Sequence, residues 1–306
     1  MRKVRGRSIH VGPMAGAPRV DTAEVPVDPY RDCLYVAADL YDATPYAESL
    51  DARAYTWSRR PPTPTATLAQ ALHDHAIDEA LTSWLTRRHL VGVMGRHDLD
   101  RSSAGYADAA RLGWMLGQEH VVATGGGPGA MEAANLGGRL AGGSRDQLAS
   151  TVASLAGVPS YRPSVDQWAA KAFTVLEGLT SVPGRESLGI PTWFYGHEPP
   201  NVFATAIAKY FRNATREAIL LEVCDAGIVF LPGAGGTVQE VFQDACENYY
   251  ADPGSIAPMV LVGHTYWTQT LPAWPLLKAL SRGRPMEPHV HLVHTVEEAA
   301  ALVAGN

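Results

Sequence analysis

The sequence predicts an α/β protein in which a doubly wound, mostly parallel sheet follows an N-terminal extension. Short apolar segments alternate with longer segments of helical periodicity over most of the chain. Few polar residues interrupt the apolar segments, which is typical of strands buried on both faces of a parallel sheet. Two of these segments end in glycine-rich turns that lead into helices. Such sheets bind ligands at the carboxyl ends of their strands, so these turns are the places to look for a site.

The composition is that of an ordinary globular protein. Of the 306 residues, 46% are hydrophobic and 18% are charged, and the formal net charge is −6. This charge gives no electrostatic footprint for nucleic acid. No segment approaches the roughly 20 apolar residues that span a bilayer, and the basic start lacks the apolar core of a secretion signal. We therefore expect a cytoplasmic protein with neither a nucleic acid nor a membrane as partner.

The cysteines and histidines indicate neither a disulfide framework nor a metal site. Cys33, Cys224 and Cys246 are far apart in the sequence. Their spacing fits neither a disulfide-rich scaffold nor a paired-cysteine metal motif. His73 and His75 are two residues apart on a predicted helix, so they point to different faces.

The chain divides into an irregular N-terminal extension, residues 1–65, and an α/β domain, residues 66–306. Eight prolines interrupt the extension. The domain begins with an amphipathic helix over residues 66–87, which carries apolar residues at helical spacing. Residues 141–187 are the least regular part of the domain, and we interpret them as an insertion with helical pieces.

The remaining elements follow the alternation in order. Apolar runs predict strands, and runs of 3.6-residue periodicity predict helices. The predicted strands are 90–95, 120–127, 189–196, 226–233, 257–263 and 289–293. The predicted helices that separate them include 106–119, 130–143, 203–223 and 237–250.

The first glycine-rich turn lies in VVATGGGPGAMEAANLGG, residues 121–138. Glycines let backbone N–H groups approach a ligand without a Cβ in the way. A helix that starts there directs the positive end of its dipole at the same point, which favours an anion such as a phosphate. A tight turn without any ligand is the alternative for this stretch alone.

The second turn, FLPGAGGTVQE at residues 230–240, repeats the arrangement. Thr237 is placed to cap the following helix, and its hydroxyl can also donate to a phosphate oxygen. Glu240 lies one turn further on, where it is either a ligand-facing carboxylate or a capping-box partner. Two such turns at carboxyl ends of strands can face each other across one crevice, where a small anionic ligand would bind.

Together the two turns resemble the signatures GGGxxGxM and PGGxGTxxE of the Lonely Guy family. The resemblance covers residues from about 90 to 300. It implies a Rossmann-like nucleotide-binding domain over residues 66–306, usually assembled as a homodimer. It also implies a phosphoribohydrolase, which cleaves the N-glycosidic bond of a nucleoside 5′-monophosphate to give a free base and ribose 5-phosphate.

The resemblance also assigns site residues. The signature residues that would bind the substrate and its phosphate are Gly125, Gly126, Gly127, Gly129, Met131, Gly233, Gly236 and Thr237. Gly235 lies between two of them, and we expect it to contact the phosphate as well. The catalytic residues would be Glu240, as a carboxylate that stabilises a positive ribose or orients water, and Arg216. Ala234 departs from the pattern, because a glycine usually stands at that position and alanine restricts positive φ.

The arginine region also departs from the family pattern. Members carry an Arg-Lys pair on the helix before the second signature, whereas here Glu217 follows Arg216. Arg212, four residues earlier, is the alternative to Arg216 or a second phosphate ligand. Arg96, in the loop after the first strand, is a further candidate for contact with the nucleotide.

Other functions fit the sequence less well, although one stays open. The departures at Ala234 and Glu217 leave room for a nucleotide sensor that binds without cutting. The glycine spacing does not match the GxGxxG motif of a dinucleotide-dependent dehydrogenase. Glycosidic cleavage by this scheme needs no cofactor and no metal. His197 and Asn201, in YGHEPPN, are candidates either for ligand contact or for stabilising a turn.

Overall fold

A computed structural model describes residues 24–179, 184–195 and 198–304 of the protein. Its centre is one seven-stranded sheet with the order β4-β3-β2-β1-β5-β6-β7. All neighbouring strands are parallel. The strands are β1 Leu90–Met94, β2 Val121–Thr124, β3 Ser187–Gly189, β4 Ala206–Ile207, β5 Gly227–Phe230, β6 Met259–Val262 and β7 Val290–Val293. The predicted doubly wound α/β fold is confirmed, and it is Rossmann-like.

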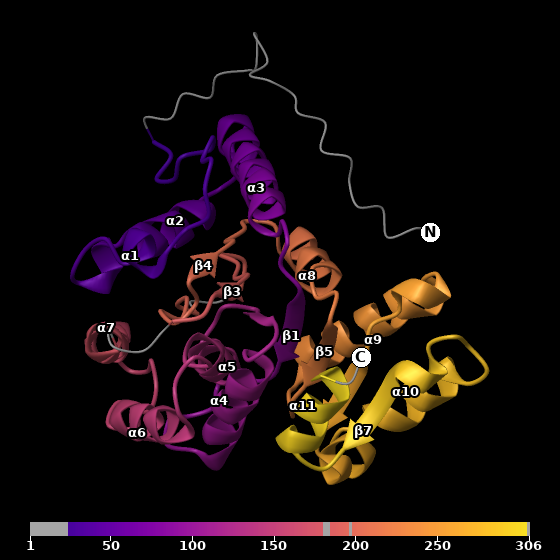
Figure 1. Cartoon of the computed structure of the whole chain (residues 1–306). Helices are drawn as coiled ribbons and strands as arrows, with labels where there is room; N and C mark the ends of the chain where they lie inside the picture. The colour runs from indigo at the N-terminus through magenta and orange to yellow at the C-terminus, as the bar shows by residue number, and fades with distance from the viewer. Residues whose placement is uncertain (1–23, 180–183, 196–197, 305–306) are drawn as a thin grey trace.

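Eleven α-helices lie among the described residues (Figure 1). Their bounds are α1 Ala37–Leu40, α2 Leu50–Ser58, α3 Pro64–Trp84, α4 Ala104–Leu116, α5 Ala130–Arg139, α6 Arg145–Leu155, α7 Val165–Gly178, α8 Asn213–Glu222, α9 Gly235–Tyr250, α10 Ala273–Ser281 and α11 Val296–Ala304. Short helical turns occur at Tyr46–Glu48, Pro253–Ser255, Tyr266–Thr270 and Glu287–His289. None of the helices described here is both long and apolar enough to cross a membrane.

Local sequence explains where the longer helices begin. Thr63 accepts a hydrogen bond from the backbone N–H of Ala66 at 3.1 Å, and Pro64 occupies the first turn of α3. A hydroxyl N-cap followed by proline is a favoured helix start. Ser103, at the start of α4, caps in the same way. The strands β1, β5 and β6 are buried along their whole length, as their undivided apolar sequences predict.

The order in which strands are added to the sheet reverses between β1 and β5, and the crevice lies at this point. In the first half of the chain, β2, β3 and β4 are added in turn on one side of β1. In the second half, β5, β6 and β7 are added in turn on the other side. Right-handed crossovers therefore place α4 and α5 on one face and α9 and α10 on the other. The α11 helix returns to pack against α4. The carboxyl ends of β1 and β5 thus flank the topological switch point, where such sheets bind ligands.

The strand boundaries differ from the expectation around residues 189–211. The sequence predicts a strand over 189–196, but β3 ends at Gly189, and Pro191 follows shortly after. It also predicts a single helix over 203–223, but residues 206–207 form β4 and α8 begins at Asn213. A short apolar run does not distinguish a buried strand from a buried helix, which explains both errors.

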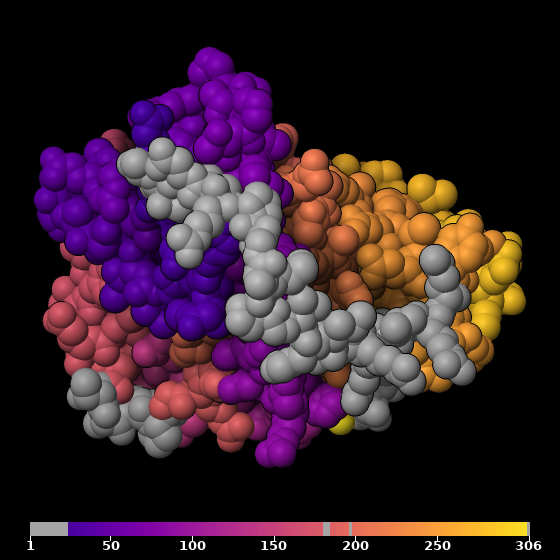
Figure 2. All heavy atoms as spheres, turned by 90° about the horizontal axis from the view of Figure 1, so that it is seen from above, coloured from indigo at the N-terminus to yellow at the C-terminus, as the bar shows by residue number. Residues whose placement is uncertain are grey.

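Part of the N-terminal extension is folded onto the edge of the sheet. The backbone of Tyr35 exchanges hydrogen bonds of 2.9 and 2.8 Å with Ile207, which covers the open edge of β4. The buried Asp51 of α2 forms an ion pair with buried Lys209 at 2.6 Å. Viewed from above, the indigo residues of this extension lie opposite the orange and yellow C-terminal half (Figure 2). The division of the chain at residue 65 stays a prediction.

Candidate functional site

The first glycine turn connects β2 to α5 and needs glycine at two positions. Gly126 and Gly129 have φ values of 72° and 69°. A Cβ on Gly129 would lie 2.6 Å from the backbone oxygen of Arg96, which is too close for any side chain. That oxygen also accepts a 3.0 Å hydrogen bond from the N–H of Ala130, the first residue of α5. The loop after β1 is thereby fixed against the start of α5.

Met131 packs against this turn from within α5. A Cβ on Gly125 would lie 2.9 Å from its Sδ, and a Cβ on Gly127 would lie 2.9 Å from its Cε. The methionine therefore fills the space beside two glycines of the signature, and side chains at either position would displace it. This is a packing role, and contact between Met131 and a ligand stays a prediction.

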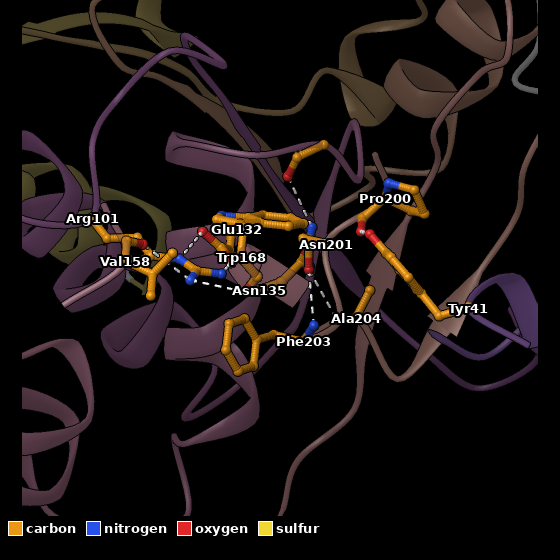
Figure 3. Close-up of polar contacts among 11 residues, drawn as sticks. Tyr41, Arg101, Glu132, Asn135, Val158, Trp168, Pro200, Asn201, Phe203 and Ala204 are labelled. Atoms are coloured by element: carbon orange, nitrogen blue, oxygen red, sulfur yellow. Dashed lines mark hydrogen bonds and ion pairs between the residues drawn. The ribbon is translucent and has the colours of Figure 1, made fainter. Parts of the chain in front are cut away.

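Asn201 ties the turn to the chain that follows β3 (Figure 3). Its backbone N–H donates to the oxygen of Gly126 at 2.8 Å. Its side-chain amide donates to the oxygen of Gly127 at 3.1 Å and to Oδ1 of Asn135 at 2.9 Å. Its Oδ1 accepts two further backbone N–H groups. Because the whole side-chain amide is used within the protein, the turn-stabilising alternative applies to Asn201.

A buried ion pair holds the first turn of α5 from the other side, and sequence reasoning missed it. The guanidinium of Arg101 is fully buried and binds both carboxylate oxygens of Glu132, with 3.1 Å between Nε and Oε2. It also stacks over the ring of Trp168, with Cζ 4.7 Å from the ring centroid (Figure 3). Glu132 lies in the first turn of α5, where the helix dipole favours a carboxylate. The pair therefore fixes the glycine turn to the insertion.

The second glycine turn connects β5 to α9. The helix begins at Gly235, so Ala234 is its N-cap residue and no side chain caps it. The prediction that Thr237 caps this helix is wrong, because Thr237 lies within the first turn. Gly235 and Gly236 are exposed, and a Cβ at either would meet no described atom within 4 Å. A Cβ on Gly233, by contrast, would lie 2.2 Å from Oγ1 of Thr237. Ala234 has a φ of −104°, so alanine is accommodated at this departure from the family pattern.

Arg216 joins the two turns. Its Nη1 lies 4.0 Å from Oε1 of Glu240 in α9, and 3.6 Å from where a Cβ on Gly125 would stand. Its Nη2 lies 3.2 Å from Oε1 of Glu217. All three charged residues are buried. One cation and two carboxylates therefore meet beneath the first turn and beside the start of α9.

This arrangement changes the protonation of Glu240. Burial and, secondly, the neighbouring charge of Glu217 raise its pKa from 4.5 to about 8, although the charge of Arg216 opposes the shift. Burial thus favours the protonated form of Glu240 in the free protein. The Nε of Arg216 is buried and has no hydrogen-bond partner among residues 24–179, 184–195 and 198–304. Buried donors without a partner are rare in folded proteins.

The other two predicted arginines are exposed. Arg96 pairs with Asp98, with 2.6 Å between Nε and Oδ1, and its side chain is 49% exposed. Arg212 is the N-cap residue of α8, and its backbone N–H donates to Asp74 at 2.9 Å. The structure thus brings Arg216 and Glu240 together. Among the described residues, Arg212 contacts Arg216 through the backbone, where its oxygen accepts the N–H of Arg216 at 3.2 Å, but neither exposed arginine side chain pairs with Arg216 or Glu240.

The remaining polar candidates form no metal centre. His73 is buried, and its ring contacts the hydroxyl of Tyr35 and the carboxylate of its neighbour Asp74. In the described part of the chain, no three His, Cys, Asp or Glu side chains are grouped to hold a metal ion. His197 lies outside the described residues.

Comparison with known proteins identifies no family. No family model matches the chain, and no curated protein matches it. A molybdenum cofactor binding protein from Rippkaea orientalis is similar in structure, with a TM-score of 0.44 and 17% identity over 72% of this chain and 97% of the other. The molybdenum cofactor carrier protein of Chlamydomonas reinhardtii is similar with a TM-score of 0.44 and 18% sequence identity, over 72% of this chain and 98% of that protein. At this level of similarity, neither identifies a ligand or an activity here.

Proposed function

We propose that this protein is a nucleoside 5′-monophosphate phosphoribohydrolase of the Lonely Guy type. It would cleave the N-glycosidic bond of a nucleotide to give the free base and ribose 5-phosphate. The observation that carries the proposal is the contact between Arg216 and Glu240. These two residues match the family's catalytic positions, and they lie next to the two glycine turns that match its signatures.

The start of α9 is suited to hold the 5′-phosphate. The backbone N–H groups of its first turn are not used within the helix, and Gly235 and Gly236 leave open space above them. The hydroxyl of Thr237 stands beside Gly233 and can donate to a phosphate oxygen. The dipole of α9, a helix of 16 residues, favours the negative charge at this end.

Glu240 is suited to act on the ribose. As the base departs with the electrons of the glycosidic bond, positive charge develops at C1′. Water then adds to C1′ and loses a proton, while the base gains one. An ionised Glu240 would stabilise the positive ring or orient the water. The raised pKa of Glu240 keeps this carboxylate close to its ionisation point near neutral pH.

Arg216 would hold this carboxylate and the substrate in register. Its Nη1 lies near Glu240, and its buried Nε has a free donor position within the described structure. A ribose hydroxyl or a phosphate oxygen could accept that hydrogen bond. This would place the arginine between the anchor and the reacting ring.

A nucleotide-binding protein without catalysis is the second candidate. Glu217 favours it, because this buried carboxylate stands where the family has a lysine and contributes to the raised pKa of Glu240. The two functions are separated by incubating the protein with a panel of nucleoside monophosphates and separating the products by chromatography. Free base supports the hydrolase, whereas tight binding without free base supports the binding protein.

We also propose a location, an assembly state and a cofactor requirement for the protein. We propose a cytoplasmic protein that forms a homodimer or a higher homo-oligomer and needs neither a metal nor a cofactor. Sedimentation tests the assembly, and activity after treatment with a chelator tests the metal requirement.

A further inference from the structure

A second carboxylate stands at the first glycine turn, apart from the Arg216 cluster. Oε2 of Glu198 lies 3.7 Å from where a Cβ on Gly127 would stand. Oε1 lies 3.7 Å from Nδ1 of His97, in the loop after β1. The side chain of Glu198 is half-buried. Its carboxylate therefore lies between the glycine turn and the neighbouring loop.

The backbone after Glu198 is firmly anchored. The next two residues, Pro199 and Pro200, are buried. The oxygen of Pro200 accepts a 2.7 Å hydrogen bond from the hydroxyl of Tyr41, which comes from the N-terminal extension (Figure 3). Asn201 then binds the backbone of the glycine turn itself. Glu198 is thus attached to the same framework that positions the turn.

The charge of Glu198 makes the first turn a poor place for a phosphate. Two negative groups within about 4 Å repel each other by several kcal/mol in a partly buried site. Lys209, a cation close enough to interact with Glu198, is already paired with Asp51. Arg216, on the Gly125 side of the turn, is already shared by Glu217 and Glu240. The exposed first turn of α9 contains Gly235 and Gly236 and no carboxylate. The two glycine turns therefore differ in the ligand groups that they favour.

We infer that Glu198 recognises the uncharged end of the nucleotide by accepting hydrogen bonds from its donor groups. This inference rests on the proposed function. The donors would be the ribose hydroxyls or an amino group on the base, and either would be held at the first turn. The phosphate would then point toward α9. Glu198 is in this view a specificity-determining residue that orients the substrate.

Calorimetry with paired probes tests the inference. Ribose 5-phosphate against 2-deoxyribose 5-phosphate tests recognition of the 2-hydroxyl. AMP against purine ribonucleoside 5′-monophosphate, which lacks the 6-amino group and carries no other donor at that edge, tests recognition of an amino group. We expect the wild type to prefer the donor-bearing member of at least one pair by tenfold or more. The same preference should fall below about twofold in Glu198→Ala, because the charged acceptor is lost. Affinity for inorganic phosphate should not fall, because the phosphate is held at α9 and the substitution removes a repelling charge from the first turn.

A matched control keeps the result specific. Glu186 is an exposed carboxylate that directly precedes β3. It therefore lies at the amino ends of the strands, whereas the glycine turns lie at their carboxyl ends. Glu186→Gln should preserve every preference of the wild type. Thermal unfolding of Glu198→Ala and Glu198→Gln tests whether the variants are folded. Because Glu198 is half-buried and its nearest ionic contact is 3.7 Å long, both should fold.

The outcomes separate this inference from the proposed function. Unchanged preferences in Glu198→Ala, or no preference in the wild type, would each refute the role of Glu198. Hydrolysis by the wild type is measured separately and does not depend on which probes Glu198 recognises. If the wild type releases no base, the hydrolase proposal fails, but the binding preferences still decide the role of Glu198. Failure to bind any probe overturns both.

Discussion

The guanidinium of Arg216 lies 4.0 Å from Oε1 of Glu240, and this contact links two glycine turns that are far apart in the sequence. The same guanidinium lies close to Gly125 of the first turn. Glu240 belongs to the helix that begins at the second turn. A change at either residue should therefore affect chemistry at the crevice rather than only the stability of one loop.

Glu240→Gln should abolish hydrolysis while preserving nucleotide binding. The amide keeps the size of the side chain but cannot provide a negative charge to a developing cation. We expect kcat to fall by 100-fold or more, with the Kd for nucleotide changed by less than about fivefold. Rapid-quench or chromatographic assays give kcat, and calorimetry gives Kd. A variant that turns over at the wild-type rate would remove Glu240 from the mechanism.

The activity should rise with pH through the ionisation of Glu240. Its pKa is raised to about 8, and the ionised form is the active one in the proposed mechanism. The kcat/KM of the free enzyme should therefore increase from pH 6, reach half its maximum near pH 8 and level off about one pH unit higher. A profile that falls over this interval would instead assign Glu240 the role of a proton donor.

The same pKa shift predicts a stability difference. A group whose pKa is higher in the folded state stabilises the fold at low pH, and this contribution is lost as pH rises toward the folded value. For Glu240 the interval runs from about 4.5 to about 8. The Tm of Glu240→Gln minus the Tm of the wild type should therefore increase steadily from pH 5 to pH 8. A constant Tm difference across these buffers would contradict the shift.

Glu217→Gln should move the pH profile to lower pH. The charge of Glu217 is the second cause of the raised pKa of Glu240, after burial, and the substitution removes that charge. The midpoint of the kcat/KM profile should fall by about half a unit or more. Glu222→Gln is the control, because Glu222 is exposed at the end of α8, five residues after Glu217, and it should leave the midpoint in place.

Much of the central fold can be predicted from the sequence, because parallel strands that are buried on both faces consist of uninterrupted apolar runs. The runs at 90–95 and 226–233 contain β1 and β5, and the glycine turns end β2 and β5 as expected. The glycine-rich turns are also visible in the sequence, although it does not show which of their glycines adopt positive φ, as Gly126 does. These features locate the crevice.

The contacts that complete the crevice could not be predicted in this way. Arg101 with Glu132, and Asp51 with Lys209, are pairs of residues that are far apart in the chain. Neither periodicity nor spacing records which distant side chains meet. The position of Glu198 beside the first turn depends on how the chain after β3 folds back, and the apolar character of that segment predicts the wrong elements.

Asp51→Ala should destabilise the whole protein, although Asp51 lies in the N-terminal extension. The substitution leaves Lys209 buried without its ion-pair partner, and it also removes the acceptor of the Tyr46 hydroxyl and of the Trp193 indole N–H. Loss of one partner of a buried pair costs about 3–5 kcal/mol. Urea denaturation measures the change. A cost below about 1 kcal/mol would show that the extension contributes little to the fold.

The most direct test of the central claim is to incubate the wild-type protein with purine and pyrimidine nucleoside monophosphates and to quantify both products. The account predicts equal amounts of free base and ribose 5-phosphate from at least one nucleotide, and neither product from Glu240→Gln. Release of inorganic phosphate, or equal base release by wild type and variant, would contradict it.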